Sequence, residues 1–302
     1  MPRHLFILTI FLMALSACGR NPASSPSETD SPAPAESQLE ALATTSMLAD
    51  IAQHVAGERV RIESILPVGA DPHSYQHTPR DVVKVSSSKL LIVNGAGYER
   101  FLNALLENTG GETEIVTASA GLSSGLEAGD PHFWLDPHNV IVYVENIREG
   151  LTHLDPDGAA EFKSNADAYV AELQSLDAWI VEQVKPIPAG RKLLVTNHES
   201  LGYFAKRFGF TVVGSVLESF SSDASPSAQQ MAMLIDEIKA SGAPAIFLDA
   251  GDNPALAQQI ADETGVRVVT DLHLESLTDG PPASTYIDMM KYNVTQIVNA
   301  LK

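Results

Sequence analysis

Two histidines that each follow an Asp-Pro pair are the first sign of chemistry in this sequence. His73 stands in the segment GADPHSY and His132 in the segment GDPHFW. Proline fixes its own backbone φ and disfavours the helical conformation at the residue before it, so such a loop can hold an imidazole in one direction. Imidazole nitrogens and carboxylate oxygens are the ligands that proteins offer to Zn²⁺ and related divalent ions. The repeated pattern therefore suggests a metal site.

A third loop histidine and a later acidic segment extend this hypothesis. His198 follows the apolar run LLVT, which predicts a buried strand. Proteins of the α/β class bind their ligands beyond the carboxyl ends of such strands. The segment DLHLES follows another apolar run and offers three further candidates, which are Asp271, His273 and Glu275. Residue chemistry alone leaves the choice among these three open.

Short apolar runs alternate with amphipathic stretches from residue 39 to the end, and this alternation predicts an α/β fold. In the first half we expect strands at residues 42–45, 60–66, 90–93 and 114–116, and helices at 47–55 and 80–87. Thr78 and Pro79 fit the cap and the first residue of the second helix. The GAG segment at 95–97 lacks the rest of a dinucleotide-binding fingerprint and predicts a tight turn after a strand.

A long amphipathic stretch, residues 158–184, separates this half from the next. Its apolar residues recur at helical spacing. Beyond it we expect strands near residues 193–196, 211–213, 245–248 and 266–269, and helices near 201–208, 227–240, 255–264 and 286–301. The simplest architecture has two α/β lobes, residues 39–154 and 187–302, joined by a linking helix within residues 155–186.

The first 38 residues carry a different signal. The apolar run at 5–17 is too short to span a bilayer and has the length of a signal-peptide core. It ends in LSAC, which resembles the lipobox of bacterial lipoproteins and predicts cleavage after residue 17 and lipid on Cys18. The alternative is an ordinary signal peptide. Residues 18–38 are rich in Ser, Pro and Ala and predict a flexible tether.

Composition excludes several other classes of site and partner. Cys18 is the only cysteine, so the sequence has no disulfide framework and no thiolate metal site. The formal net charge is −19, which disfavours nucleic acid as a partner because phosphates require a basic surface. An acidic surface is compatible with attracting cations, although it commonly serves solubility alone.

Five segments agree with one known family in order and spacing. They are GADPHSYQHTPRDV, NGAGYERFLN, DPHFWLDPHNV, TNHESLGYFAKRFG and ESLTDGPPASTYIDMMKYNV. On these segments the chain resembles the solute-binding lipoproteins of bacterial zinc and manganese ABC importers, the TroA- and ZnuA-like family. The resemblance covers residues 39–302. It implies two Rossmann-like lobes joined by a rigid helix, with the metal in the cleft between the lobes.

The resemblance also implies a ligand set, which is His73, His132, His198 and Glu275. The late carboxylate of the family is usually aspartate, so a glutamate at this position is a departure. Its side chain is one methylene longer, and Asp271 therefore stays the alternative carboxylate.

Two further histidines are not expected to bind metal. In the family, the segment that matches Leu135, Asp136 and Pro137 begins a helix, with the aspartate as cap and the proline as first residue. His138 then belongs to the first turn and points away from His132. His77 lies at a variable position just before a helix cap.

Three imidazoles and one carboxylate suit Zn²⁺, whereas Mn²⁺ prefers more oxygen ligands. Family members associated with manganese often carry glutamate where this chain has His198, which also favours zinc. Zinc-specific relatives, however, often have a His-rich loop between the first two ligands, and residues 99–129 contain no histidine. We therefore expect Zn²⁺ as the cargo, with Mn²⁺ or mixed transport as the alternative.

The predicted function is capture of the ion and delivery to the membrane permease of an ABC importer. We expect a monomer anchored by lipid on Cys18, either in a periplasm or on the outer face of the cytoplasmic membrane. A zinc hydrolase with Glu199 as base is a weaker alternative, because the sequence has no HExxH motif. An adhesin that binds a host protein would leave the histidine motifs unexplained.

Overall fold

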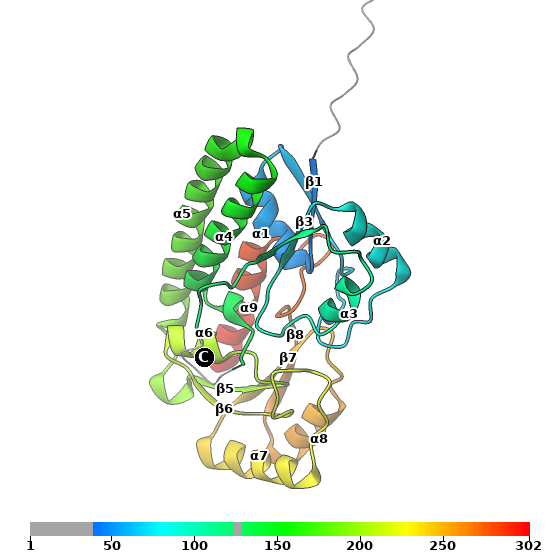
Figure 1. Ribbon diagram of the computed structural model, residues 1–302. Helices are drawn as coiled ribbons and strands as arrows, with labels where there is room; N and C mark the ends of the chain where they lie inside the picture. Colours follow the sequence, from blue (N-terminus) through cyan, green and yellow to red (C-terminus); the bar gives the residue numbers. More distant parts are fainter. Residues whose placement is uncertain (1–38, 124–128) are drawn as a thin grey trace, which may run out of the picture. The chain divides into compact units, whose positions relative to one another are not determined.

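Each half of the chain builds one four-stranded parallel sheet. A computed structural model describes residues 39–123 and 129–302 (Figure 1). The predicted signal peptide, the tether and the lipidation site at Cys18 lie outside these residues. The predicted α/β class is confirmed, and each half holds one parallel sheet.

Sheet A has the strand order β2-β1-β3-β4. Its strands are β1 (Leu39–Ala43), β2 (Val60–Ser64), β3 (Leu90–Val93) and β4 (Glu114–Thr117). The helices of this half are α1 (Ser46–Ala56), α2 (Pro79–Ser87), α3 (Leu102–Leu106) and α4 (Pro137–Leu154). Leu90 and Ile92 pack against α1 and α4, whereas Leu91 and Val93 pack against α2 and α3. Both faces of the sheet are therefore covered, which explains the continuous apolar run of β3.

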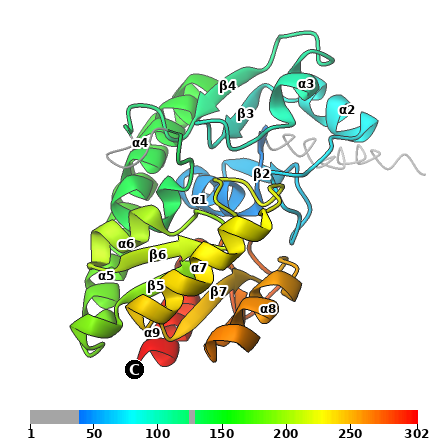
Figure 2. The same cartoon turned by 90° about the horizontal axis from the view of Figure 1, so that it is seen from below.

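Sheet B repeats this order as β6-β5-β7-β8. Its strands are β5 (Leu193–Thr196), β6 (Thr211–Ser215), β7 (Ala245–Asp249) and β8 (Arg267–Leu272). The helices are α6 (Gly202–Phe208), α7 (Ala228–Ser241), α8 (Ala255–Thr264) and α9 (Tyr286–Leu301). Ile246 and Leu248 face α7 and α8, and Phe247 faces the opposite core with α6 and α9. Figure 2 shows α7 in front of the strands of this sheet.

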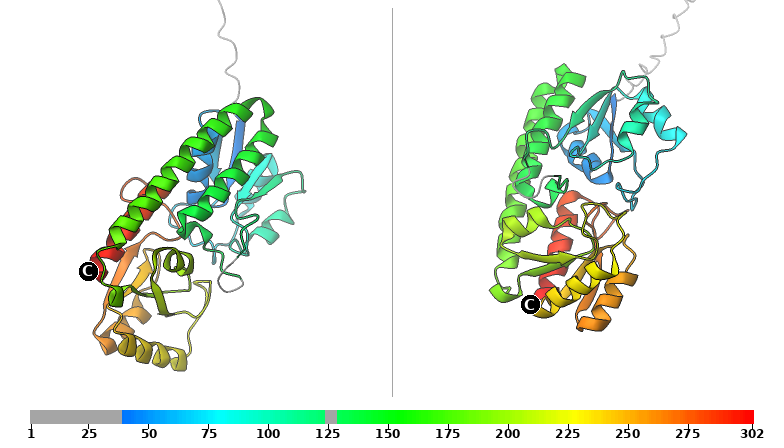
Figure 3. Two further views of the ribbon diagram at one scale, coloured as in Figure 1. Left: turned by 90° about the vertical axis from the view of Figure 1, so that its left-hand side faces the viewer. Right: turned by 60° about the horizontal axis from the view of Figure 1, so that its bottom comes forward.

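The 26-residue helix α5 (Ala159–Val184) lies between the two sheets in the chain and contacts both halves. It packs against α1 and α4 of the first half and against α6 and α9 of the second (Figure 3). One apolar cluster includes Leu90 of sheet A, Phe247 of sheet B and Leu173 of α5. Because these residues share a core, moving one sheet relative to the other would disturb the packing of α5.

Local sequence signals account for several element ends. Thr78 caps α2 and exchanges hydrogen bonds with Asp81, and Pro79 is the first residue of that helix, as predicted. The tight turn after β3 is also confirmed, because Gly95 has a φ of 86°. A Cβ atom on Gly95 would lie 2.5 Å from the Thr117 side chain, so only glycine fits there.

Two helices were not predicted in full. Helix α3 has only five residues and no side-chain cap, so its sequence carries little signal. Helix α4 was predicted only at its start, and it contains Gly150, which lowers helix propensity. A Cβ atom on Gly150 would meet Val116 of β4 at 2.2 Å, so the glycine permits close packing of helix on sheet. None of the helices in the described part of the chain has the length and apolar composition that a bilayer crossing requires.

Candidate metal centre

Four buried side chains from four different loops converge on one point. They are His73 after β2, His132 after β4, His198 after β5 and Glu275 after β8. Each offers one ligand atom, and these atoms all lie within 4.8 Å of one another. His132 is fully buried and Glu275 is only 6% exposed. The structure thus brings together all four residues of the ligand set that the sequence suggested.

The two Asp-Pro-His segments orient their histidines through the same local turn. The backbone N–H of His73 donates to Asp71 Oδ1 at 2.8 Å, and that of His132 donates to Asp130 Oδ1 at 2.9 Å. An aspartate that accepts from the backbone two residues on forms an Asx turn, and the intervening proline has no N–H to compete. His138 and Asp136 form the same turn, but there it opens helix α4.

Asp130 also orients the ring of His132. Nδ1 of His132 lies 2.9 Å from Asp130 Oδ1, so this nitrogen donates to the carboxylate and Nε2 faces the cluster. Nε2 of His132 lies 3.3 Å from Nε2 of His198 and 3.4 Å from Oε1 of Glu275. The distance from His198 Nε2 to the same carboxylate oxygen is 3.2 Å. These three atoms therefore form a nearly equilateral triangle.

The buried charges of the cluster are unequal. Burial lowers the pKa of His73 to about 4. Burial also opposes the charged form of His132, but the carboxylates of Asp130 and Glu275 outweigh it and raise the pKa of His132 to about 9. Burial alone would raise the pKa of Glu275, yet the rings of His132 and His198 hold it well below its usual range. The carboxylates of Asp130 and Glu275 therefore favour the protonated form of His132.

Both halves of the chain hold the segment that carries Glu275. From the second half, the Asp249 carboxylate accepts from the backbone N–H groups of Leu274 and Glu275. From the first half, Tyr98 donates its hydroxyl to Glu275 Oε2 at 2.5 Å, and Trp134 Nε1 donates to the Leu274 carbonyl at 2.9 Å. Contacts from both halves therefore fix the position of this carboxylate.

The other candidates from the sequence lie elsewhere. Asp271 is exposed and accepts a hydrogen bond from the Tyr292 hydroxyl at 2.7 Å, so it is not part of the cluster. His138 belongs to a separate group with Asp136 and Asp177. In that group the Arg207 guanidinium already donates to both oxygens of Asp177. His77 is absent from both groups of candidate ligands found among the described residues.

Sequence reasoning missed the residues that support the ligand set. Asp130 was visible in the repeated Asp-Pro-His pattern, although its contact with the His132 ring was not predicted. Tyr98 belongs to the quoted segment NGAGYERFLN but has no local feature that points to Glu275, which is 177 residues away in the chain.

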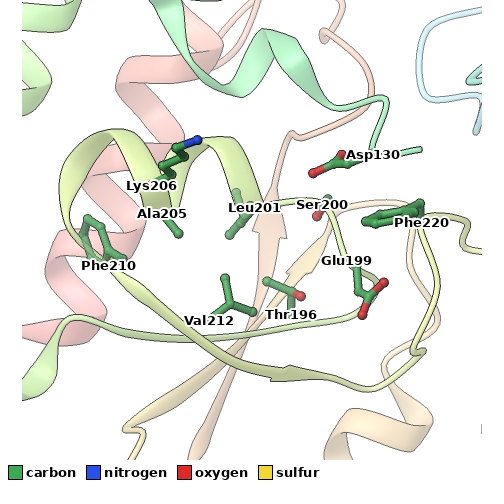
Figure 4. Close-up of a pocket in the computed structure, with 11 residues that line it drawn as sticks. Asp130, Thr196, Glu199, Ser200, Leu201, Ala205, Lys206, Phe210, Val212 and Phe220 are labelled. Carbon is green, nitrogen blue, oxygen red and sulfur yellow. The ribbon is translucent and has the colours of Figure 1, made fainter. Parts of the chain in front are cut away.

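Two cavities lie near the cluster. One of about 240 Å³ is lined by His73, Gly97, Arg100 and Pro131 from the first half and by Ser219, Phe220 and Ser221 from the second. Arg100 and Asp223 form an ion pair at 3.6 Å between the two halves. The other cavity, of about 520 Å³, has mostly apolar walls that include Leu201, Phe210 and Val212, and the Asp130 carboxylate lies at its edge (Figure 4). Only the smaller cavity reaches a histidine of the cluster.

Comparison with known proteins identifies the family. The family model described as "Zinc-uptake complex component A periplasmic", or ZnuA, matches residues 42–300. The chain belongs to the ZnuA family. This family consists of substrate-binding components of transporters, so the chain is not an enzyme and the hydrolase alternative is excluded. As a ZnuA-family member it belongs to the cell envelope and works outside the cytoplasm.

Relatives within the ZnuA family carry the names of different metals. The manganese-binding lipoprotein MntA of Halalkalibacterium halodurans is 33% identical, over 98% of this chain and 97% of its own length. The iron-binding protein YfeA of Yersinia pestis is 33% identical, over 89% and 88%. The solved structure of the periplasmic zinc-binding protein TroA from Treponema pallidum has a TM-score of 0.81 and 29% identity, over 87% and 99%.

The role of Asp130 is testable without any metal. Asp130→Asn keeps an acceptor oxygen but removes the negative charge, so we expect the pKa of His132 to fall by about one unit or more. NMR titration of the His132 ring in metal-free protein measures this shift. The stability that protonated His132 contributes is present below about pH 6.5 and is lost as pH rises through about 9. In the variant this contribution should be smaller and its loss should be complete at a lower pH. Asp271→Asn, at an exposed site, is the control. An unchanged His132 titration in Asp130→Asn would contradict this assignment.

Proposed function

We propose that this chain captures a divalent transition metal ion outside the cytoplasm and delivers it to the permease of an ABC importer. The proposed ligands are Nε2 of His73, His132 and His198 and Oε1 of Glu275. Zn²⁺ is the preferred ion in this proposal and Mn²⁺ is the alternative.

The spacing of the candidate ligand atoms carries this proposal. An ion at about 2.0–2.1 Å from four atoms at the corners of a tetrahedron keeps those atoms about 3.3 Å apart. The triangle of His132 Nε2, His198 Nε2 and Glu275 Oε1 has sides of 3.3, 3.4 and 3.2 Å. Three of the four proposed ligand atoms therefore have the spacing that a zinc-sized ion requires.

Unpartnered polar atoms support the same proposal. His73 Nε2 and Glu275 Oε1 are buried and have no hydrogen-bond partner within the described residues. Burying a polar atom without a partner costs about 1–3 kcal/mol, and more for a charged one. A cation at the centre of the cluster would satisfy both atoms at once.

In this proposal, Zn²⁺ is preferred to Mn²⁺ because of the chemistry of the ligands. Three nitrogens and one oxygen match the preference of Zn²⁺, whereas Mn²⁺ is favoured by sites richer in oxygen. The names of several relatives, such as the manganese-binding lipoprotein MntA, support the alternative. Affinity of most sites follows an order in which Zn²⁺ exceeds Mn²⁺, so the ion carried in the cell also depends on supply.

Release follows from the way the ligands are divided. His73 and His132 precede α5 in the chain, and His198 and Glu275 follow it. We propose that residues 39–154 and 187–302 act as two lobes and that residues 155–186, which include α5, connect them stiffly. A small separation of the lobes would split the ligand set into two pairs and weaken binding sharply. The permease would favour this open state, and the capturing protein would act as a monomer.

Contacts between the lobes oppose that separation. Ser276 accepts a hydrogen bond from the Gly69 N–H at 2.8 Å, and Ser222 donates to Asp71 at 2.5 Å. Each contact includes a residue close in sequence to a proposed ligand. Ser276 follows Glu275, and Asp71 precedes His73 by two residues. These two contacts lie at partly exposed positions, so docking on a membrane partner can replace them.

Substitution of the ligands tests the proposed site. We expect His132→Ala and His198→Ala each to reduce Zn²⁺ affinity by about 100-fold or more, because each removes a direct ligand. Competition with a chelator, followed by the fluorescence of Trp134, measures the affinity; this ring is buried and lies 5.2 Å from the His132 ring. His138→Ala and His77→Ala are matched controls and should keep wild-type affinity. Equal loss in the controls, or none in the ligand variants, would refute the assignment.

The membrane anchor is a separate part of the proposal. We propose that the chain is attached to the membrane by lipid on Cys18, within the LSAC segment. Cys18→Ser removes the acceptor of the lipid, so the variant should move from the membrane fraction to the soluble fraction of the cell envelope. Fractionation followed by immunoblotting measures this change. A variant that stays with the membrane as the wild type does would show that another feature holds the protein there.

A further inference from the structure

The two oxygens of the Glu275 carboxylate have different surroundings. Oε1 faces Nε2 of His132 and of His198, and it has no hydrogen-bond partner among the described residues. Oε2 accepts a 2.5 Å hydrogen bond from the hydroxyl of Tyr98 and lies 3.7 Å from His73 Nε2. One oxygen is therefore available to an ion, and the other is already held by a protein donor.

Tyr98 is fixed in place by the turn that carries it. The turn after β3 has positive φ at Gly95, Ala96 and Gly97. The Glu99 carboxylate fastens this turn, because it accepts from the Thr44 hydroxyl at 2.7 Å and from the Gly95 N–H at 3.1 Å. Because this backbone is restrained, the Tyr98 hydroxyl would not move with the Glu275 carboxylate if that carboxylate shifted.

The ring of Tyr98 is equally restrained. Its side chain is fully buried. The ring lies 5.0 Å from that of His73 in an edge arrangement and 4.7 Å from that of Trp134. Close packing of the ring on two sides therefore holds the hydroxyl near Glu275.

The length of the glutamate side chain completes this arrangement. Glu275 starts from a backbone N–H held by Asp249 in the second half and reaches Tyr98 in the first half. It places Oε1 among the histidines and Oε2 on the hydroxyl at the same time. An aspartate on the same backbone would be one methylene shorter and would lose one of these two contacts.

We propose that Tyr98 sets the coordination number of the site by holding Glu275 Oε2, so that Glu275 binds the ion through Oε1 alone. This inference rests on the proposed function. A carboxylate restricted to one oxygen leaves three nitrogens and one oxygen, the four-coordinate set that Zn²⁺ accepts and Mn²⁺ does not prefer. Tyr98 is thus a positioning residue that discriminates between the two ions without contacting either.

Tyr98→Phe tests this role because it removes only the hydroxyl. Once Oε2 is released, Glu275 can offer both oxygens, which favours an ion that takes more ligands. We expect the ratio of Zn²⁺ to Mn²⁺ affinity to fall by about tenfold or more, the effect of losing one hydrogen bond to a charged group. Competition titrations with both ions, followed by Trp134 fluorescence, measure this ratio.

Cobalt provides a direct readout of coordination. Four-coordinate Co²⁺ has intense visible absorption, and higher coordination numbers weaken it. We expect intense bands for the Co²⁺-loaded wild type and weaker bands for Tyr98→Phe. Tyr143→Phe is the matched control, because Tyr143 is also fully buried and donates its hydroxyl to Asn94 rather than to Glu275. It should keep the wild-type spectrum and affinity ratio.

The possible results separate this inference from the proposed function. A wild-type protein that binds neither Zn²⁺ nor Mn²⁺ would overturn the proposed function itself. Wild-type binding with the same spectrum and affinity ratio in Tyr98→Phe would overturn only the role of Tyr98. If that variant does not fold, X-ray absorption of the Zn²⁺-loaded wild type decides. Four nitrogen and oxygen neighbours support the inference, and five or more overturn it.

Discussion

The burial of one carboxylate between two halves of the chain is the constraint on which this structure depends. An ionised group taken out of water is costly unless charges and hydrogen bonds compensate it. For Glu275 the compensation comes from both halves, with His132 and Tyr98 on one side and His198 on the other. Because both halves supply residues of the proposed site, a bound cation would stabilise the contact between them.

The fold is arranged to bring the carboxyl ends of two parallel sheets together. Both sheets have the order second, first, third, fourth, and each proposed ligand lies in a loop that follows a strand. Helix α5 packs against helices of both halves and shares one apolar core with both sheets, so we expect only limited separation of the halves. In the proposed function, binding and release should therefore require only small displacements, because His132 Nε2, His198 Nε2 and Glu275 Oε1 already lie 3.2–3.4 Å apart.

Much of the fold could be predicted because its signals are local. The apolar runs of β3 and β5 were predicted at their observed bounds, and Thr78, Asp136 and their following prolines mark helix starts. The four residues that the structure brings together were also found from the sequence. Loop motifs supplied the three histidines, whereas Glu275 was preferred over Asp271 only through the family resemblance.

What could not be predicted depends on contacts between distant segments. The local sequence of a tyrosine in a glycine-rich turn does not show whether its side chain is exposed or buried. Tyr98 is buried and contacts Glu275. In the sequence, Gly150 predicts an interruption of the helix. Only the folded structure shows that this glycine lets the helix pack closely against Val116. Ligand chemistry favours Zn²⁺, while relatives named for manganese and iron have similar chains, so residue types alone do not identify the cargo.

One diffraction experiment tests the central claim most directly. Crystals grown with equal amounts of Zn²⁺ and Mn²⁺ would be measured at wavelengths around the absorption edge of each metal. We predict one anomalous peak with the zinc signature, about 2.0–2.1 Å from Nε2 of the three histidines and from Glu275 Oε1. A manganese signature at that position would change the cargo but keep the site. No peak there, or a peak only beside His138 and Asp177, would contradict the claim that these four residues bind the transported ion.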